Sequence, residues 1–233
     1  MLPHPPPRRA LLIFADEAKL DLSRRGLPAG ALPLLQFPSL RHEPAVTADI
    51  HVFNSAPACS RDAARFHRQR GADFAERFEN AIETLSALGY DEIVAIGRDC
   101  PTLCTGDIAQ AFEELSERQL VLGPDHRGGC YLIAFRARDR ALLRNIRWNR
   151  NTDCAQLRAR CNEDGVFLLP IKHDLDSWSD LRLLARGSDW IAELASSLFR
   201  IVFAAGGIAR FFVDLARHFV RVRGQMPPPV RAA

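Results

Sequence analysis

The sequence predicts an α/β protein whose mostly parallel, twisted sheet carries helices on both faces. Short apolar runs of strand length alternate with stretches of helical periodicity, which is the pattern of βαβ units. The apolar runs are nearly continuous, as expected for strands that are buried on both faces of a sheet. The length of 233 residues and the 47% hydrophobic content suit one globular domain with a helical appendage.

The expected elements follow one another in a regular order. Apolar runs predict strands at residues 10–15, 48–54, 91–97, 119–123, 130–135 and 166–169. Helical spacing and capping residues predict helices at residues 71–88, from a cap at Thr105 or Asp107 to 117, at 152–164 and at 177–186. Residues 24–44 contain four prolines and no clean period, which predicts an irregular loop or a distorted hairpin.

Two polar segments that each follow an expected strand are candidates for ligand binding. Asp99, in the segment 97–101, is expected at the carboxyl edge of the sheet, where it is either a ligand-binding carboxylate or a turn residue or helix cap. Gly128 and Gly129 lie between two strands, and paired glycines permit either close approach of a ligand to the backbone or an ordinary tight connection. Position alone does not choose between these interpretations.

A third polar segment contains Asp174 and Asp176 on either side of one apolar residue. In an extended segment the two carboxylates share a face and can hold a divalent cation. The alternative is that Asp176 or Ser177 caps the helix that follows.

Five motifs in a fixed order carry a resemblance to a bacterial family. They are QRGADFAERF at 69–78, IGRDCP at 96–101, GPDHRGGCYLIA at 123–134, WNR at 148–150 and DLDSWSDL at 174–181. Their order and spacing resemble domain-of-unknown-function family 2064, a group of candidate glycosyltransferases. The resemblance covers roughly residues 10–186 and implies the Rossmann-like GT-A fold of nucleotide-diphospho-sugar transferases.

The resemblance also implies a chemistry. A nucleotide-activated sugar is the expected substrate and Mg²⁺ or Mn²⁺ the expected cofactor, because a cation neutralises the charge on a leaving nucleoside diphosphate. It implies that Asp99, Asp174 and Asp176 are catalytic, with Asp99 and Asp176 as metal ligands or one carboxylate as the general base for the acceptor. The residues that it implies for donor binding are Lys19, Arg98, Arg127, Gly128, Gly129, Trp148 and Arg150.

The loop after the first strand departs from the family pattern. The family has a Pro-Gly and a Lys-Thr-Arg there, whereas this chain has DEAKLDLSRR at residues 16–25. Lys19 and the pair Arg24 and Arg25 are the candidates left in this loop to reach a phosphate.

Three further positions have gained arginine. Arg127 replaces the acidic residue of an Asp-Gly-Gly motif, Arg98 replaces a serine or threonine, and Arg150 follows Asn149 where the family has Ser-Thr. Either these arginines bind a diphosphate directly and take over part of the metal's role, or the site has lost catalysis. In the second case the protein is a non-catalytic GT-A-fold protein that binds a ligand, a partner or a membrane surface.

The positive charge is concentrated at the C-terminal end. Residues 190–233 carry six arginines against two acidic residues, so the main body is close to neutral and is not expected to bind nucleic acid. Residues 189–222 have a narrow polar stripe on a wide apolar face, which predicts an amphipathic helical extension to the 10–188 domain. Residues 190–223 are expected to pack on the main domain, in a homodimer, or on an anionic membrane surface.

The two chain ends, residues 1–9 and 223–233, are rich in proline and are predicted to be disordered. No apolar run reaches the ~18 residues of a membrane span, and the N-terminal residues do not have the pattern of a signal peptide. A cytoplasmic location is therefore expected, either free or peripheral at the inner membrane.

Overall fold

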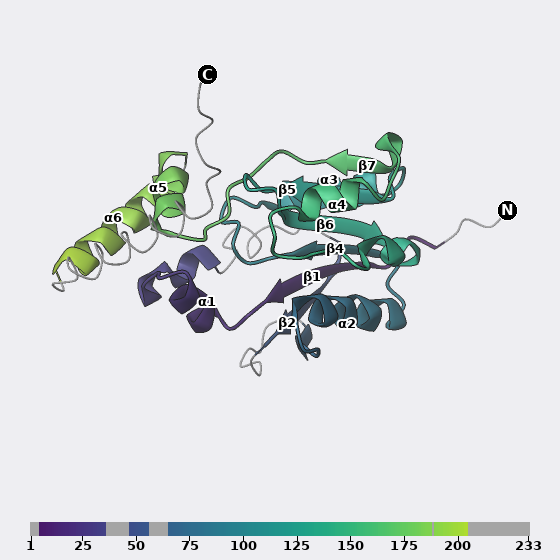
Figure 1. Ribbon diagram of the computed structural model, residues 1–233, viewed down its shortest axis with the longest axis horizontal. Coiled ribbons are helices and arrows are strands. Elements are labelled where there is room, and N and C mark those ends of the chain that lie inside the picture. Colours follow the sequence, from purple (N-terminus) through teal and green to yellow (C-terminus); the bar gives the residue numbers. More distant parts are fainter. Residues whose placement is uncertain (1–4, 36–46, 56–64, 188, 205–233) are drawn as a thin grey trace, which may run out of the picture.

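A seven-stranded sheet forms the centre of the computed structural model, which describes residues 5–35, 47–55, 65–187 and 189–204 (Figure 1). The strand order is β3-β2-β1-β4-β6-β5-β7. All neighbouring strands pair in parallel except β6, which is antiparallel to both β4 and β5. The expected α/β class with a mostly parallel sheet is confirmed. The strands are β1 Arg9–Ala15, β2 Asp49–Asn54, β3 Arg65–Arg68, β4 Glu92–Ile96, β5 Leu120–Pro124, β6 Cys130–Arg136 and β7 Val166–Leu168.

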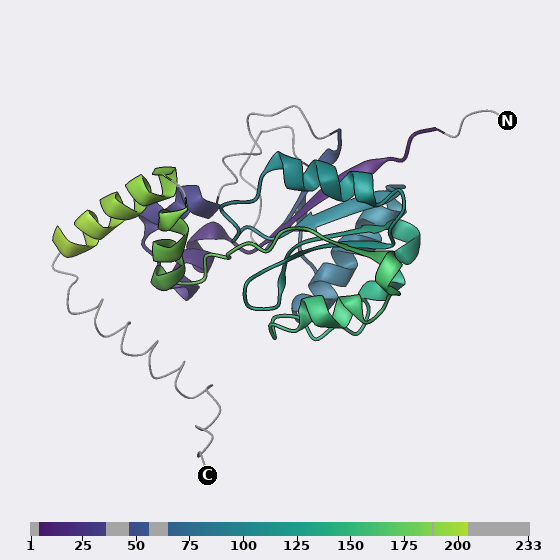
Figure 2. The same ribbon diagram turned by 90° about the horizontal axis from the view of Figure 1, so that it is seen from above.

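Helices cover both faces of the sheet. Leu12 of β1 packs with α2 and α4 in one hydrophobic core, and the next residue, Ile13, packs with α3 in the other. This alternation follows from the two-residue period of a strand. Figure 2 shows α3 on one side of the sheet and α2 and α4 on the other. The helices are α1 Ala18–Arg24, α2 Phe74–Ala87, α3 Thr105–Glu114, α4 Asp153–Arg158, α5 Trp178–Arg186 and α6 Asp189–Ala204, with 3-10 helices η1 Ala29–Leu35, η3 Ala137–Leu143 and η4 Glu163–Gly165.

Three local expectations differ from the structure. The edge strand β3 was not expected, because its sequence RFHR is too polar to signal a strand. The expected irregular loop at 24–44 contains the helix η1, which forms because Ala31 and Leu34 are buried; residues 36–46 lie outside the described part. The helix expected at 152–164 is divided between α4 and η4.

The helix caps were predicted in part correctly. Ser177 caps α5, and its hydroxyl accepts a hydrogen bond from the main-chain N–H of Asp180. The cap expected for α3 at Thr105 or Asp107 is Cys104 instead, and the main-chain N–H of Cys104 donates to Asp107 Oδ2 over 2.8 Å. Asp107 therefore contributes to the cap from inside the first turn of α3, where its side chain accepts this hydrogen bond.

The N-terminus of α2 offers a test of helix capping. Asp73 accepts a hydrogen bond from the main-chain N–H of Glu76 over 2.9 Å, and Glu76 accepts one from the N–H of Ala72 over 2.8 Å. Asp73→Ala is expected to lower the free energy of unfolding in urea by about 1 kcal/mol, because the N–H of Glu76 loses its acceptor. Asp73→Asn keeps the acceptor and should cost much less, so equal losses in both variants would refute this role.

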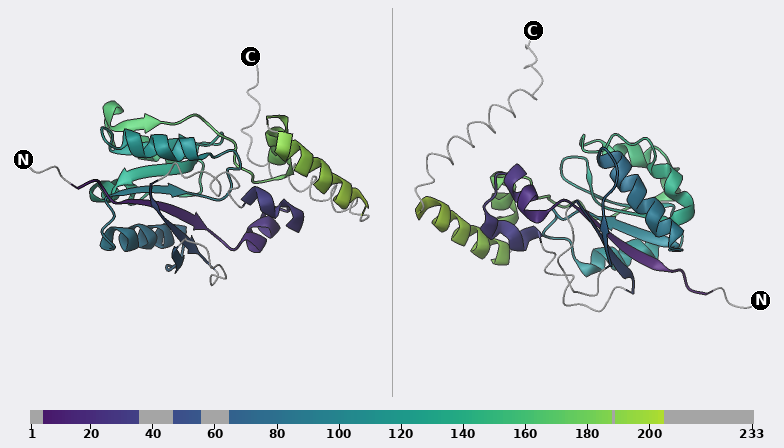
Figure 3. Two further views of the ribbon diagram at one scale, coloured as in Figure 1. Left: turned by 180° about the vertical axis from the view of Figure 1, so that it is seen from behind. Right: turned by 90° about the horizontal axis from the view of Figure 1, so that it is seen from below.

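A second, smaller core lies beside the sheet, where α1, η1, α5 and α6 pack together (Figure 3). Ile191, Ala195 and Leu198 of α6 are almost fully buried in this core. The first part of the expected helical extension therefore packs on its own chain. Within the part of the chain that the structure describes, no helix is both long enough and apolar enough to cross a bilayer.

Several predictions for the chain ends lie outside the described residues. They concern residues 1–4, the continuation of the extension beyond 204 and the tail at 223–233. A homodimer contact or an anionic-membrane contact through residues 190–223 remains a sequence-based hypothesis.

Candidate functional site

A cleft of about 440 Å³ opens at the carboxyl ends of β1 and β4. Its walls come from these strand ends, from α1 and α2, and from the loops that precede β6, α4 and α5. In open α/β sheets, ligands bind outside the carboxyl ends of the strands. The cleft therefore has the position of a ligand site.

The lining of the cleft is strongly acidic. Seven aspartates face three arginines, so most of the carboxylates are not neutralised by a guanidinium of the lining. The ten residues are Asp16, Asp21, Asp99, Asp125, Asp153, Asp174, Asp176, Arg25, Arg77 and Arg98.

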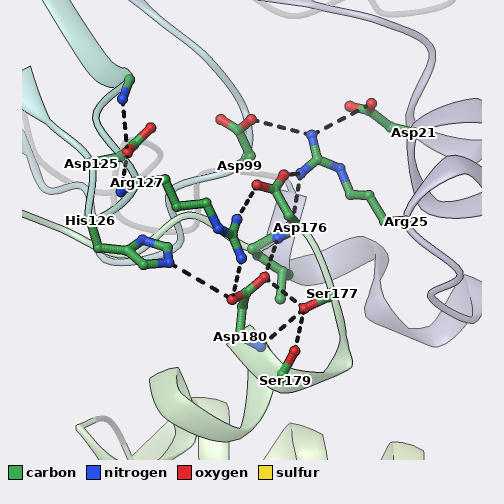
Figure 4. Close-up of polar contacts among 12 residues, drawn as sticks. Asp21, Arg25, Asp99, Asp125, His126, Arg127, Asp176, Ser177, Ser179 and Asp180 are labelled. Carbon is green, nitrogen blue, oxygen red and sulfur yellow. Dashed lines mark hydrogen bonds and ion pairs between the residues drawn. The ribbon is translucent and has the colours of Figure 1, made fainter. Parts of the chain in front are cut away.

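Arg25 is the centre of an ion-pair network at this cleft (Figure 4). Its guanidinium lies 3.2 Å from Asp99 Oδ2 and 3.7 Å from Asp21 Oδ1, and it donates a hydrogen bond to Asp176 Oδ1. It also donates to the main-chain oxygen of Leu175 over 2.7 Å. Burial acts to lower the pKa of Arg25, but the three carboxylates raise it above its ordinary value, so the side chain is a permanent cation.

Arg127 extends the same network away from the cleft. It donates to Asp176 Oδ2 and, over 2.6 Å, to Asp180 Oδ1, as Figure 4 shows. Asp180 is buried and also accepts a hydrogen bond from Ser177 Oγ over 2.8 Å. Asp176 is therefore held between two guanidinium groups, those of Arg25 and Arg127.

Asp174 has a different environment. Its side chain is buried, with 8% of the residue exposed, and its Oδ1 has no hydrogen-bond partner. Burial, followed by the negative charges of Asp99 and Asp125, raises the pKa of Asp174 to about 9. A buried carboxylate without a partner is costly, so this oxygen has the character of a ligand-binding atom.

Only some of these carboxylates are placed to bind a divalent cation. The guanidinium of Arg25 stands between Asp99 and Asp176, where the family resemblance implies the metal. Asp174 has an unpartnered buried oxygen, and the carboxyl groups of Asp99 and Asp125 act on it. Among the described residues, no group of three or more His, Cys, Asp and Glu side chains has the arrangement of a complete metal cage. A cation here would accordingly need oxygens from water or a ligand as well.

Gln69 carries a second unpartnered hydrogen-bond acceptor at the cleft. Its Nε2 donates to the main-chain oxygens of Ala15 and Phe53 over 2.9 and 3.1 Å, so the amide orientation is set by two acceptors. Its Oε1 is buried without a partner, and the residue lines the cleft. The aromatic side chains that line the cleft are Phe14, Phe74, Phe78, Tyr131 and Trp148.

The structure brings some of the expected site residues together and separates others. The expected residues that line the cleft are Arg98, Asp99, Gly129, Trp148, Asp174 and Asp176. Arg127, Gly128 and Arg150 lie outside its lining, so direct contact of Arg127 or Arg150 with a ligand in this cleft is not supported. Lys19 lies in α1, and its side chain is not among the described atoms.

The arginine pair expected to reach a phosphate has other partners. Arg24 pairs with Asp16 over 2.5 Å, and Arg25 pairs with three carboxylates. Sequence reasoning missed Gln69, Asp125 and Asp153 as lining residues. Gln69 and Asp125 lie within quoted motifs, which was a usable signal, whereas Asp153 had none.

The fold is similar to that of nucleotide-diphospho-sugar transferases. A candidate nucleotide-diphospho-sugar transferase of Desulfovibrio desulfuricans G20 has a TM-score of 0.68 and 23% identity over 84% of this chain and 95% of that chain. A cytidylyltransferase of Leptospira borgpetersenii serovar Hardjo-bovis has a TM-score of 0.56 and 14% identity, covering 87% and 97%. Rv0371c of Mycobacterium tuberculosis H37Rv, in complex with manganese, has a TM-score of 0.50 and 14% identity, covering 76% and 97%.

At the level of sequence, residues 41–150 match domain-of-unknown-function family 2064, described as an uncharacterized protein conserved in bacteria. The match includes four of the five motifs and confirms the resemblance that they carry. The comparison with curated proteins gives no match.

Proposed function

We propose that the protein transfers a glycosyl or nucleotidyl group from a nucleotide-activated donor, with the help of a divalent cation. The observation that carries the proposal is the cleft at the carboxyl edge of the sheet, whose lining combines many aspartates with aromatic side chains and the unpartnered acceptor of Gln69. The first suits a cation and phosphates, and the second suits a base or a sugar. The similarity in fold to nucleotide-diphospho-sugar transferases supports this class of substrate.

The charge of the cleft is the main argument for the cation. A diphosphate brings negative charge into a lining where aspartates outnumber arginines. A divalent cation supplies the missing positive charge and, when bound, would polarise the phosphate oxygens and stabilise the leaving group. Arg98 lines the cleft, where the charges of Asp21, Asp16 and Asp99 act on its guanidinium, and a phosphate is a further anion that this guanidinium can bind.

Asp174 is the carboxylate best placed to hold a proton or a cation inside the cleft. With a pKa of about 9 it is protonated at neutral pH, so it cannot act as a general base in this state. A bound cation would take the place of that proton.

Calorimetric titration of the full chain with the four common nucleoside diphosphates, with and without Mn²⁺, tests the proposal. At least one nucleotide is expected to bind only with the cation present. Binding of none of them, with Mn²⁺ or with Mg²⁺, would overturn it.

A second candidate function is supported by one observation. The guanidinium of Arg25 joins Asp99 to Asp176, which resembles a site closed by the protein's own cation. A non-catalytic binding protein with this fold would show that feature. Nucleotide binding without turnover of any nucleotide sugar would favour this second function.

Gln69 gives a prediction about the base. Its Oε1 can only accept a hydrogen bond, and every common base carries N–H groups. Gln69→Met is expected to weaken nucleotide binding by about tenfold, the value of one lost hydrogen bond of ~1.4 kcal/mol. Inorganic pyrophosphate, which has no base, should bind both proteins equally well. An equal loss for pyrophosphate would mean that the substitution disturbs the whole cleft.

A further inference from the structure

Because Arg25 already pairs with Asp99 and Asp176, a divalent cation is expected at other carboxylates of this cleft. We propose that Asp125 and Asp174 bind the divalent cation, and that the Arg25 guanidinium fills the position between Asp99 and Asp176. The inference deepens the proposed function, on which it rests for the use of the cation, but cation binding can be measured without any nucleotide.

Both oxygens of Asp176 are already paired with guanidinium groups. Its Oδ1 accepts from Arg25 and its Oδ2 accepts from Arg127. Asp99 Oδ2 is likewise engaged by Arg25 over 3.2 Å. A divalent cation placed between Asp99 and Asp176 would lie against the guanidinium of Arg25, and the repulsion between the two cations opposes that arrangement.

The backbone brings Asp125 and Asp174 together. The parallel pairing of β5 and β7 continues beyond the strands through a bridge between Asp125 and Lys172. The main-chain N–H of His126 donates to the Lys172 oxygen over 3.0 Å. Asp174 follows two residues later, and the carboxyl groups of Asp125 and Asp174 are within hydrogen-bonding contact.

The carboxyl group of Asp125 is held in place by its own loop. Its Oδ1 accepts from the main-chain N–H groups of Arg127 and Gly129 over 2.6 and 3.0 Å. A Cβ atom at position 129 would lie 2.4 Å from Asp125 Oδ2, so the glycine makes room for this oxygen. The loop thereby presents one oriented carboxylate to the cleft.

The unpartnered oxygen of Asp174 is the independent sign of a ligand. Oδ1 is buried, belongs to a residue that lines the cleft, and has no donor within reach. Two carboxyl groups in contact repel each other when both are ionised, and a shared cation removes that repulsion. Mg²⁺ commonly takes one or two protein carboxylates and completes its shell with water and substrate phosphates, so two carboxylates suffice.

The loop before β6 differs from the family pattern in the position of its acidic residue. Arg127 stands where the resembling family has an acidic residue, and Asp125 places a carboxylate two residues earlier in the same loop. Arg127 pairs with Asp176 and Asp180 and does not line the cleft itself, whereas Asp125 does. The loop therefore keeps one acidic group in the cleft.

Titration of the full chain with Mn²⁺, with the free ion measured by electron paramagnetic resonance, tests the proposal. The unmodified protein is expected to bind Mn²⁺, and Asp125→Asn and Asp174→Asn are each expected to weaken binding by about tenfold or more. Asp176→Asn should weaken it by less than about threefold, because that carboxylate is already paired. Asp164→Asn, at an exposed position in η4, is the matched control for a lost surface charge.

Asparagine at 125 retains the oxygen that accepts from the loop N–H groups, so the variant keeps the fold, which thermal unfolding of each variant checks. The proposal is overturned if the unmodified chain binds no Mn²⁺, if Asp125→Asn binds as the unmodified chain does, or if Asp176→Asn loses as much as Asp125→Asn. Mn²⁺ binding through Asp125 without any nucleotide binding would reject the proposed function alone. Nucleotide binding with an unaffected Asp125→Asn variant would reject only the cation site.

Discussion

Arg25→Met is expected to lower the free energy of unfolding by about 2 to 3 kcal/mol, measured by urea denaturation at neutral pH. The Arg25 side chain is 15% exposed and faces three carboxylates, which lose their common counter-ion in the variant. The value lies below that of a fully buried pair because the Asp99 and Asp176 side chains are 30% and 47% exposed and keep part of their hydration. Methionine preserves most of the aliphatic stem, so the loss reports the charge.

The neighbouring residue provides the control. Arg24 pairs with Asp16, and its side chain is 59% exposed, so Arg24→Met should change the unfolding free energy by no more than about 0.5 kcal/mol. Equal effects of the two substitutions would show that Arg25 is an ordinary surface residue.

Addition of Mn²⁺ should stabilise Arg25→Met more than the unmodified chain. Removal of the guanidinium frees Asp99 and Asp176, which then offer a second cation position, and a ligand of the folded state raises the melting temperature. The same rise in both proteins would show that Arg25 does not compete with a metal.

Acid is expected to remove the stability that a buried histidine, His51, contributes at the edge of the sheet. His51 is fully buried, and its Nδ1 lies 2.9 Å from His67 Nε2 while its Nε2 lies 2.9 Å from the hydroxyl of Tyr90. Tyr90 donates its single proton to Asp49, so its oxygen accepts from His51. Burial, followed by the positive charges of His67 and Arg65, lowers the pKa of His51 to about 4.

The lowered pKa fixes the direction of the pH dependence. The unfolded chain takes up a proton at His51 near pH 6.5, whereas the folded protein resists protonation until about pH 4. The contribution of His51 to stability is complete above pH 6.5 and is lost as the pH falls toward 4, with about 2 kcal/mol of it lost between pH 7 and pH 5. Asp174, whose pKa is raised, contributes in the opposite direction over this range, so the His51 contribution is measured as the difference between the unmodified chain and His51→Phe in urea unfolding at the two pH values.

Two variants separate this pair from other titrating groups. Between pH 7 and pH 5 the unfolding free energy of His51→Phe should lose about 2 kcal/mol less than that of the unmodified chain, because the His51 contribution is gone while those of His67, His126 and Asp174 remain. His173→Asn, at an exposed position, should leave the dependence unchanged. An equal change with pH in His51→Phe and in the unmodified chain would show that His51 does not contribute to the acid sensitivity.

The sequence predicted the elements whose signal is local. The strand β4 has five buried residues in a row and reads as a central strand from its apolar run alone. The polar strand β3 and the helix η1 escaped prediction because both depend on tertiary contacts: β3 on its pairing with β2, and η1 on its packing with α6. Propensity in such short segments is too weak to reveal them.

The candidate site was predictable to the same extent. The rule that strands end at one edge of a parallel sheet places Asp99, Asp174 and Asp176 in one region, and all three line the cleft. Their partners were not predictable, because Arg25 meets Asp99 and Asp176 from 74 and 151 positions away in the sequence. In the sequence, an arginine that pairs with carboxylates cannot be distinguished from an arginine that binds a phosphate.

The central claim is that this cleft binds a nucleotide together with a divalent cation. A crystal structure of the full chain with Mn²⁺ and the nucleoside diphosphate that binds most tightly, with the metal located by anomalous scattering, tests it most directly. The expected result is a nucleotide whose base lies at Gln69, a manganese ion on Asp125 and Asp174, and Arg25 still between Asp99 and Asp176. A manganese ion between Asp99 and Asp176 with Arg25 displaced, or a nucleotide bound outside the cleft, would contradict it.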